Sequence, residues 1–337
     1  MTELNVVQGG RTQQREPLPH EEEFLTNLEA VDSYCKDRSS DGGLNLGFEQ
    51  MTEAFFGLQT GVTFIGGAAN TGKSALVMNL ALNVARLNEN VYVSFHTLDD
   101  SMRETVPRAV ACLQRIPINA VKFPARYEER GATNLLVRRE EGMRQLSQMA
   151  PSFGIRDETY NGHGETIESI EKSIKQLKLA LEDKQLVVFI DNFHDLTTVE
   201  LSGNAEDKAV FTYLVNRLHS MANQYDIPIV CTAEFKKIDG FRRPAMGDIR
   251  EANKLTYATK AILLCYNEVG MKGEDSNIFW ERPGFQEKQP ILEVHFAKNK
   301  YSSYKGTLCF NFYTEQSRVE EVPQEGARLL LASRRRT

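Results

Sequence analysis

The sequence predicts an α/β fold with a mostly parallel sheet and an antiparallel C-terminal edge. Short apolar runs alternate with segments whose apolar residues recur every three to four positions, which is the pattern of strands separated by amphipathic helices. Late in the chain, two apolar runs are joined by a short polar hairpin, which indicates antiparallel strands. With 337 residues, 41% of them hydrophobic, the chain is long enough for one large domain or two small ones.

Four regions are expected along the chain. Residues 1–19 are polar and lack periodicity, so we expect a disordered tail. Residues 20–43 predict a linker helix, from 20 to 37, and a flexible joint containing Gly and Ser. The main domain covers 44–320, and 321–337 are expected to form a frayed, solubilising tail that ends in Arg334, Arg335 and Arg336. Within the domain, strands are predicted at 62–65, 91–97, 151–159, 186–190, from 227, at 261–266, 291–298 and in TLCFNFY, and helices at 73–88, 102–115, 134–149, 165–181 and 208–224.

A phosphate-binding loop is predicted between the first of these strands and its helix. Four residues satisfy G-x-x-x-x-G-K-[ST] in the strand–loop–helix context that the motif requires. Glycines let successive backbone N–H groups point at one anion, and the helix adds the positive end of its dipole. We expect Lys73 to reach the β- and γ-phosphates of ATP and Ser74 to bind Mg²⁺. The predicted binding segment comprises Gly67, Ala68, Ala69, Asn70, Thr71, Gly72, Lys73, Ser74 and Ala75.

An acidic residue follows a fully apolar strand further along the chain. The run Leu186–Ile190 places Asp191 at its C-terminal end, where ligands collect in an α/β sheet. The alternative is that an aspartate in this position serves only as a turn or cap residue. Downstream of a phosphate-binding loop, the expected role is to hold Mg²⁺ through water.

Composition and charge exclude several classes of protein. No window of eighteen apolar residues and no apolar signal core is present, so we expect a cytoplasmic protein with no membrane partner. A net charge of −6 argues against coating nucleic acid with the whole surface, but it allows a ring whose basic residues face a channel. The cysteines are predicted to be buried thiols of a reducing compartment, namely Cys35, Cys112, Cys231, Cys265 and Cys309.

An ordered set of motifs resembles the C-terminal ATPase domain of the DnaB-type replicative helicases, which has a RecA-like fold. The resemblance covers about Leu44 to about Val319. It rests on LNLGFEQMTEAFFGLQTGVTFIGG, SFHTLDD, RIPINAV, FIDNFHDL, YDIPIVCTAEFKK, RRPAMGDIREA and FAKNKYSSYKGTLCFNF. The resemblance implies a RecA-like P-loop NTPase core with ATP and Mg²⁺ as cofactors. It also implies single-stranded DNA, a homo-oligomeric ring, expected to be a hexamer, and other replication proteins as partners.

The resemblance also suggests further catalytic residues. Asp99 matches the family's water-activating glutamate, with a side chain one methylene shorter. Asp100 is next to it and could substitute for it. The alternative role for this position is a helix N-cap. Glu234 stands where the family has a glutamine that senses the γ-phosphate, and the alternative is a solvated charge at a strand end. Lys298 and Lys300 match a lysine and an arginine that reach the neighbouring subunit's γ-phosphate, and Lys300 lacks the planar fork of arginine.

A DNA-binding loop is implied by the segment GDIREAN. It resembles the family's channel loop and points to Arg250, Glu251, Ala252 and Asn253, the last standing where the family has a glycine. The basic residues around it suit phosphate tracking with little base readout, and they are Lys236, Lys237, Arg242, Arg243 and Lys254. A basic surface loop without a partner is the alternative.

Three functions are compatible with these motifs. The first is a ring-forming DNA-dependent ATPase that translocates on single-stranded DNA and unwinds duplex. By resemblance, the linker helix would dock on the adjacent subunit. Full-length family members carry a helical domain ahead of the linker, and the resemblance, which covers the ATPase domain, does not imply the primase and loader contacts of that domain. The second is a nucleotide-gated scaffold with weak or no hydrolysis, which the changes at Asp99, Glu234 and Lys300 would suit. The third is a recombinase-like strand-exchange protein, but no segment of this sequence resembles the N-terminal polymerisation motif of that family.

Overall fold

The computed structural model describes residues 4–8, 11–37, 42–157, 165–201, 206–236, 238, 240–249 and 252–333. The chain divides into two units, Met1–Gly43 and Leu44–Thr337.

The first unit contains a hairpin and one long helix. Strands β1 (Leu4–Gln8) and β2 (Arg11–Arg15) pair antiparallel, whereas the sequence predicted disorder there. Two adjacent valines in β1 favour the extended conformation. Helix α1 (Pro19–Asp37) matches the predicted linker helix. Three apolar side chains of this helix are exposed in this unit, Phe24 at 62%, Leu28 at 47% and Val31 at 58%.

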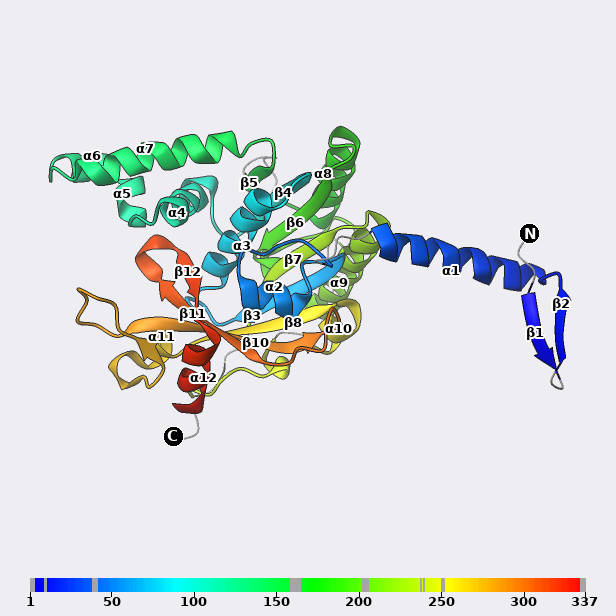
Figure 1. The fold of residues 1–337 in the computed structure, drawn as a ribbon. Coiled ribbons are helices and arrows are strands. Elements are labelled where there is room, and N and C mark those ends of the chain that lie inside the picture. The colour runs from blue at the N-terminus through cyan, green and yellow to red at the C-terminus, as the bar shows by residue number, and fades with distance from the viewer. Residues whose placement is uncertain are drawn as a thin grey trace. The chain divides into compact units, whose positions relative to one another are not determined.

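The second unit is built on a ten-stranded sheet with the order β12-β11-β10-β8-β3-β7-β6-β4-β5, and β9 pairs with β10 (Figure 1). In this order, the strands β8, β3, β7, β6, β4 and β5 are parallel to one another, whereas β8, β10, β11 and β12 pair antiparallel. This arrangement confirms the predicted fold class. The strands are β3 (Gly61–Gly67), β4 (Val91–Thr97), β5 (Phe153–Asp157), β6 (Gln185–Asp191), β7 (Pro228–Glu234), β8 (Ala261–Asn267), β9 (Phe279–Trp280), β10 (Gln289–Asn299), β11 (Thr307–Tyr313) and β12 (Arg318–Glu321).

Helices cover both faces of this sheet. They are α2 (Glu49–Phe55), α3 (Lys73–Leu87), α4 (Met102–Gln114), α5 (Ile118–Lys122), α6 (Pro124–Glu128), α7 (Thr133–Gln148), α8 (Ile167–Ala180), α9 (Asp207–Gln224), α10 (Ala252–Ala258), α11 (Glu268–Lys272) and α12 (Gln324–Ser333). Short 3₁₀ turns include Phe193–Asp195 and Thr314–Gln316. Among the described residues, no helix is long and apolar enough to span a membrane.

Alternation along the central strands creates two hydrophobic cores. In β6, Val187 and Phe189 join the core that contains α3, whereas Val188 and Ile190 join the core formed with α8 and α9. Successive side chains of a strand point to opposite faces, so a continuous apolar run supplies both cores. The two-sided burial explains why these strands could be predicted from short apolar runs.

The C-terminal segment is helical where the sequence predicted a frayed tail. Helix α12 buries Ala327, which belongs to a small core with Ile278 and Ile291. The sequence does not indicate this helix, because the residues that Ala327, Leu330 and Leu331 pack with lie far away along the chain. Arg334, Arg335 and Arg336 lie outside the described residues.

A buried polar chain connects β4 to the start of α8. His96 is fully buried, its Nδ1 lies 2.8 Å from Glu165 Oε1, and its Nε2 lies 2.9 Å from Ser94 Oγ. Glu165 Oε2 has no hydrogen-bond partner within the part of the chain that the structure describes. Buried polar groups of this kind stabilise a fold only while their partners are present.

Replacing Glu165 with alanine is therefore expected to lower the free energy of unfolding by about 1–3 kcal/mol, because the ring of His96 loses its buried partner. Urea denaturation followed by circular dichroism measures the change, with Glu287→Ala as an exposed carboxylate control. Equal stability of the two variants would contradict a stabilising role for the buried pair.

Candidate active site

The phosphate-binding loop lies between the end of β3 and the start of α3. Lys73 Nζ donates a hydrogen bond to the carbonyl oxygen of Ala68 at 2.9 Å, and Thr71 Oγ1 donates to the same oxygen at 2.8 Å. The lysine side chain thus folds back over the loop. Gly72 has φ 105°, and a Cβ there would lie 2.9 Å from the Phe312 ring, so both backbone conformation and space require glycine.

Asp191 lies beside this loop at the C-terminal end of β6. Its Oδ1 accepts a hydrogen bond from Thr232 Oγ1 at 2.5 Å. Burial raises the pKa of Asp191, whereas hydrogen bonds from Thr232 and Ser74 and the charge of Lys73 oppose the rise. The structure therefore brings Lys73, Ser74 and Asp191 together, as the sequence predicted.

This group of residues fits Mg²⁺. A hydroxyl and a buried carboxylate are the hard oxygen ligands that Mg²⁺ takes, and the buried negative charge would be stabilised by a cation. In the described parts of the chain, no cluster of three or more His, Cys, Asp or Glu side chains could hold a metal. Ser74 and Asp191 would thus hold the ion together with phosphate oxygens and water, as in other phosphoryl-transfer sites.

Asp99 and Asp100 follow β4 at the same edge of the sheet but differ in their contacts. Asp100 forms an ion pair with Arg108, and its backbone oxygen accepts from Thr97 Oγ1 at 2.7 Å. Asp99 is exposed. The N-cap of α4 is Ser101, whose side chain makes no capping bond, and the Met102 N–H donates to Asp157. This geometry disfavours the N-cap alternative for Asp99 and engages Asp100 elsewhere.

Glu234 closes β7 next to these groups. Its backbone N–H donates to His194 Nδ1 at 3.1 Å. Burial raises the pKa of Asp195, and the charges of Asp99 and Glu234 raise it further, which indicates that the three carboxylates are neighbours. Glu234 also borders a cavity of about 280 Å³ lined by Ala68, Ala69 and Thr71 of the loop. Its side chain therefore belongs to the site, although its role as a phosphate sensor stays a prediction.

An aromatic and guanidinium cluster on the same edge was not predicted. The guanidinium carbons of Arg318 and Arg282 lie 3.8 and 4.9 Å from the centre of the Tyr313 ring, and Trp280 meets that ring edge-on at 5.0 Å. Tyr313 follows Phe312, which packs against Gly72 of the loop. Residues this far apart in sequence give no motif, so only the pairing of β10, β11 and β12 reveals the cluster.

Lys298 and Lys300 lie at the opposite edge of the sheet. Lys298 pairs with Ile262 near the start of β8, and β8 begins beside Thr63 near the start of β3. Lys298 Nζ donates to the carbonyl oxygens of Thr256 and Thr259 and lies 3.3 Å from Thr259 Oγ1. Neither lysine is brought to the phosphate-binding loop of its own chain.

The predicted DNA-binding residues are only partly described. Lys237, Arg250 and Glu251 lie outside the described residues, as do the side chains of Ala252 and Asn253, which begin α10. Lys236 is exposed, and its N–H donates to the Asp248 carbonyl at 2.8 Å.

Arg243 makes contacts that the sequence did not indicate. Its guanidinium donates to both carboxylate oxygens of the buried Glu293, at 2.9 and 2.7 Å, and to Glu268 at 3.1 Å. Arg243 thus fastens the loop before α10 to β10 and α11. Contact of this guanidinium with DNA would require these ion pairs to break, and its role in DNA binding stays a prediction.

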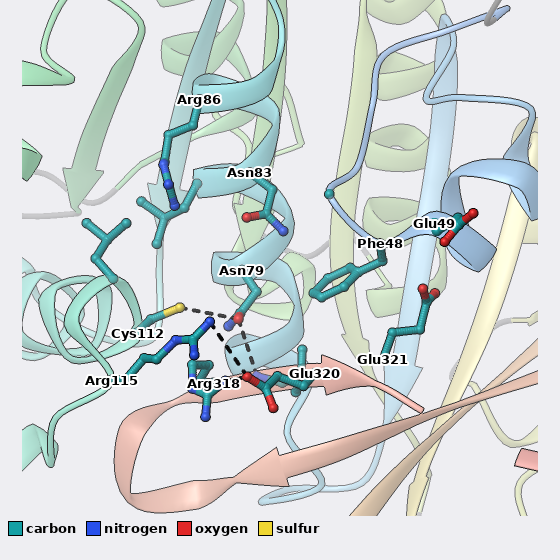
Figure 2. A pocket seen from close by; sticks show the side chains of 14 residues that line it. Phe48, Glu49, Asn79, Asn83, Arg86, Cys112, Arg115, Arg318, Glu320 and Glu321 are labelled. Atoms are coloured by element: carbon teal, nitrogen blue, oxygen red, sulfur yellow. Dashed lines mark hydrogen bonds and ion pairs between the residues drawn. The ribbon is translucent and has the colours of Figure 1, made fainter. Parts of the chain in front are cut away.

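A second cavity, of about 390 Å³, lies between α3, α4 and β12. Figure 2 shows Asn79, Asn83 and Arg86 along α3, with Arg115, Arg318 and Glu320 near Asn79. Cys112 Sγ lies 3.2 Å from Asn79 Oδ1, and burial raises the pKa of this thiol to about 12. The thiol of Cys112 therefore stays protonated at neutral pH.

The cysteines differ in exposure. Cys231, Cys265 and Cys309 are buried and Cys112 is partly buried, whereas Cys35 on α1 is exposed. The prediction of buried thiols was thus wrong for Cys35, which lies on the predicted linker helix but is exposed there.

The fold and the site define a P-loop nucleoside triphosphatase of the RecA-like class. The sequence profile of the DnaB-like helicase C-terminal domain matches residues 43–321, and the chain belongs to this family. No curated protein sequence is significantly similar to the chain.

Two solved structures share the fold. One, described as an ATPase domain, has a TM-score of 0.73 and 20% identity over 91% of this chain and 100% of its own. The other, described as a DnaB-like replicative helicase and its interactions with primase, has a TM-score of 0.72 and 19% identity over 92% of this chain and 68% of its own.

Proposed function

We propose that the protein is a ring-forming, DNA-dependent ATPase that translocates on single-stranded DNA and unwinds duplex DNA. One observation carries the proposal: the predicted catalytic groups lie at opposite edges of one sheet. The seven residues of β3 span about 20 Å, so Lys298 and Lys300 cannot reach a nucleotide on Lys73 of the same chain. A complete site then requires a second copy. Head-to-tail repetition of that contact gives a closed ring when the rotation between copies returns to the first one, and a ring is the form we propose.

In this proposal, Lys73 and the loop N–H groups bind the phosphates. Ser74 and Asp191 would hold Mg²⁺, which would supply positive charge to neutralise the phosphates. Asp99 orients a water molecule and accepts its proton as the water oxygen bonds to the γ-phosphorus. The bond from that phosphorus to the bridging oxygen breaks, and ADP and phosphate leave. Lys300 of the next copy would stabilise the charge of the transition state.

Assembly and DNA binding are assigned to segments outside this site. The exposed apolar residues of α1 suit docking on an adjacent copy, since an isolated helix of this kind gains stability from a partner surface. The basic segment around α10 would follow the phosphates of single-stranded DNA in the cytoplasm. Because a similar structure is described with primase, other replication proteins are proposed as further partners.

Tyr313 is proposed to support the base of ATP, because an aromatic ring with guanidinium groups close to it, beside a phosphate-binding loop, suits a nucleobase. Replacing it with alanine is expected to raise KM for ATP about tenfold with little change in kcat, the pattern of lost ground-state binding. Steady-state kinetics check this, with Tyr127→Ala on α6 as a control tyrosine outside the proposed sites. An unchanged KM would contradict the assignment.

A nucleotide-gated scaffold is the second candidate. Two observations favour it. Asp100 is engaged by Arg108, so of these two aspartates Asp99 is left for water activation, and its side chain is shorter than the family's glutamate. The Lys298 ammonium already contacts backbone oxygens. Such a protein would bind ATP and DNA without unwinding.

Steady-state ATP hydrolysis with and without single-stranded DNA distinguishes the two functions. A motor is expected to hydrolyse several-fold faster with DNA, and Lys73→Ala should abolish the difference. Binding of both ligands without stimulated turnover would overturn the motor and favour the scaffold. Strand displacement from a forked duplex then tests unwinding.

A further inference from the structure

We propose that Arg108 decides which of two adjacent aspartates serves as the base in ATP hydrolysis. It holds Asp100 in an ion pair, which leaves Asp99 to face the nucleotide. Without Arg108, the carboxylate of Asp100 would become available as a second base. Arg108 is thus a positioning residue that acts through Asp100. This inference rests on the proposed ATPase and specifies how its water-activating group is chosen.

The backbone of the loop between β4 and α4 is fixed next to Asp191. The Leu98 N–H donates to the carbonyl oxygen of Asp191 at 2.6 Å, and Thr97 Oγ1 donates to the carbonyl oxygen of Asp100 at 2.7 Å. Asp99 lies between these two anchored positions. A change in side-chain contacts can therefore alter which carboxylate is available without a movement of the chain.

The spacing along α4 explains why Arg108 reaches Asp100. The helix begins at Met102, and Arg108 follows less than two turns later. A helical side chain leans toward the N-terminus of its helix, so this guanidinium extends back to the loop. Glu104 on the same helix is engaged by Lys122, whose Nζ donates to both of its carboxylate oxygens at 2.8 and 2.5 Å. Arg108 pairs instead with Asp100.

Asp100 belongs to a group of acidic side chains at the site. Burial raises the pKa of Asp191, and the charge of Asp100 adds to the rise, which indicates that the two carboxylates are near each other. An unpaired Asp100 would add a negative charge where Mg²⁺ and the phosphates of ATP are expected to bind. The side chains of Arg108 and Asp100 are each only 31% exposed, so solvent screens their attraction only in part. The ion pair therefore reduces repulsion between the site and ATP.

Asp99 and Asp100 carry the same side chain, so their contacts and their places in the loop distinguish them. Asp99 accepts the proton of the attacking water as the water oxygen bonds to the γ-phosphorus and the bond to the bridging oxygen breaks. Asp100 could accept the same proton only after it loses Arg108. Removal of Arg108 then has opposite effects in two backgrounds. It weakens ATP binding in the wild type, and it supplies a base where Asp99 is missing.

The first test measures kcat for ATP hydrolysis with Mg²⁺ in variants of the full chain. Asp99→Asn is expected to lower kcat by about 10²–10⁴-fold, the usual contribution of a general base. Addition of Arg108→Gln should raise kcat of that variant at least about tenfold, because Asp100 takes over part of this role. A third substitution, Asp100→Asn, should abolish the gain. The matched control is Asp99→Asn with Arg103→Gln, since Arg103 is exposed on the same helix, and it should show no gain.

The inference is wrong if kcat does not rise in Asp99→Asn/Arg108→Gln, or if the rise survives the addition of Asp100→Asn. Absence of hydrolysis in the wild type would show instead that the proposed function fails. The binding experiment that follows would then decide the pairing of Arg108 with Asp100 alone.

Nucleotide binding provides this second readout, which does not depend on turnover. The Kd of a fluorescent, non-hydrolysable ATP analogue with Mg²⁺ should rise about fivefold in Arg108→Gln, because the free charge of Asp100 repels the phosphates. Addition of Asp100→Asn should bring the Kd back to within about twofold of the wild type, and Arg108→Lys, which keeps the charge, should also stay within about twofold. A Kd that stays high in Arg108→Gln/Asp100→Asn would show that Arg108 itself contacts the nucleotide, and it would overturn the proposed role.

Discussion

Mixing the Lys73→Ala and Lys300→Ala variants is expected to restore ATP hydrolysis that neither variant shows alone. Each proposed site takes its phosphate-binding loop from one copy and its lysines from the next, because these groups lie at opposite edges of the sheet. In a randomly mixed ring of equal parts, about a quarter of the interfaces would combine an intact loop with an intact Lys300. A coupled-enzyme assay across mixing ratios measures the recovery, which should peak near equal amounts.

The matched control mixes Lys73→Ala with Asp191→Asn. Both residues belong to the same edge of the sheet, so no interface in the mixed ring regains an intact loop side and activity should stay low. Recovery in this control, or its absence in the first mixture, would show that the site is not divided between copies as proposed.

Replacing Asp191 with asparagine is expected to lower kcat by about 10²–10³-fold, since the loss of a Mg²⁺-holding carboxylate removes several kcal/mol of transition-state stabilisation. The fold should not suffer. Burial raises the pKa of Asp191, so the native state disfavours its charge. This cost is fully present at pH values above the raised pKa and disappears as the pH falls below the ordinary carboxylate range. Asparagine keeps an oxygen for Thr232 without the charge.

Two measurements separate these effects. Steady-state kinetics with Mg²⁺ give kcat, and thermal unfolding without Mg²⁺ is expected to give a Tm for Asp191→Asn at or above that of the wild type. A kcat within tenfold of the wild type would exclude Asp191 as a metal-holding residue, and a markedly lower Tm would assign the loss to unfolding.

Local signals explain how much could be predicted. The loop from Gly67 to Ser74 is contiguous, and the apolar runs around β3 and β6 reflect burial on both faces of a parallel sheet. The hairpin of β1 and β2 and the helix α12 were missed because polar composition and a terminal position favoured disorder. Their structure depends on pairing and packing that residue order does not display.

The site residues divide in the same way. The sequence by itself determined the phosphate-binding loop, the carboxylate of Asp191 and the order of the strands along the chain, because each depends on neighbouring residues and on the period of a helix or strand. Only the tertiary structure decided that Arg108 engages Asp100, that Arg243 is tied to Glu293 and that Lys298 contacts the end of α10. These contacts join side chains from separate elements, and their formation depends on how those elements pack.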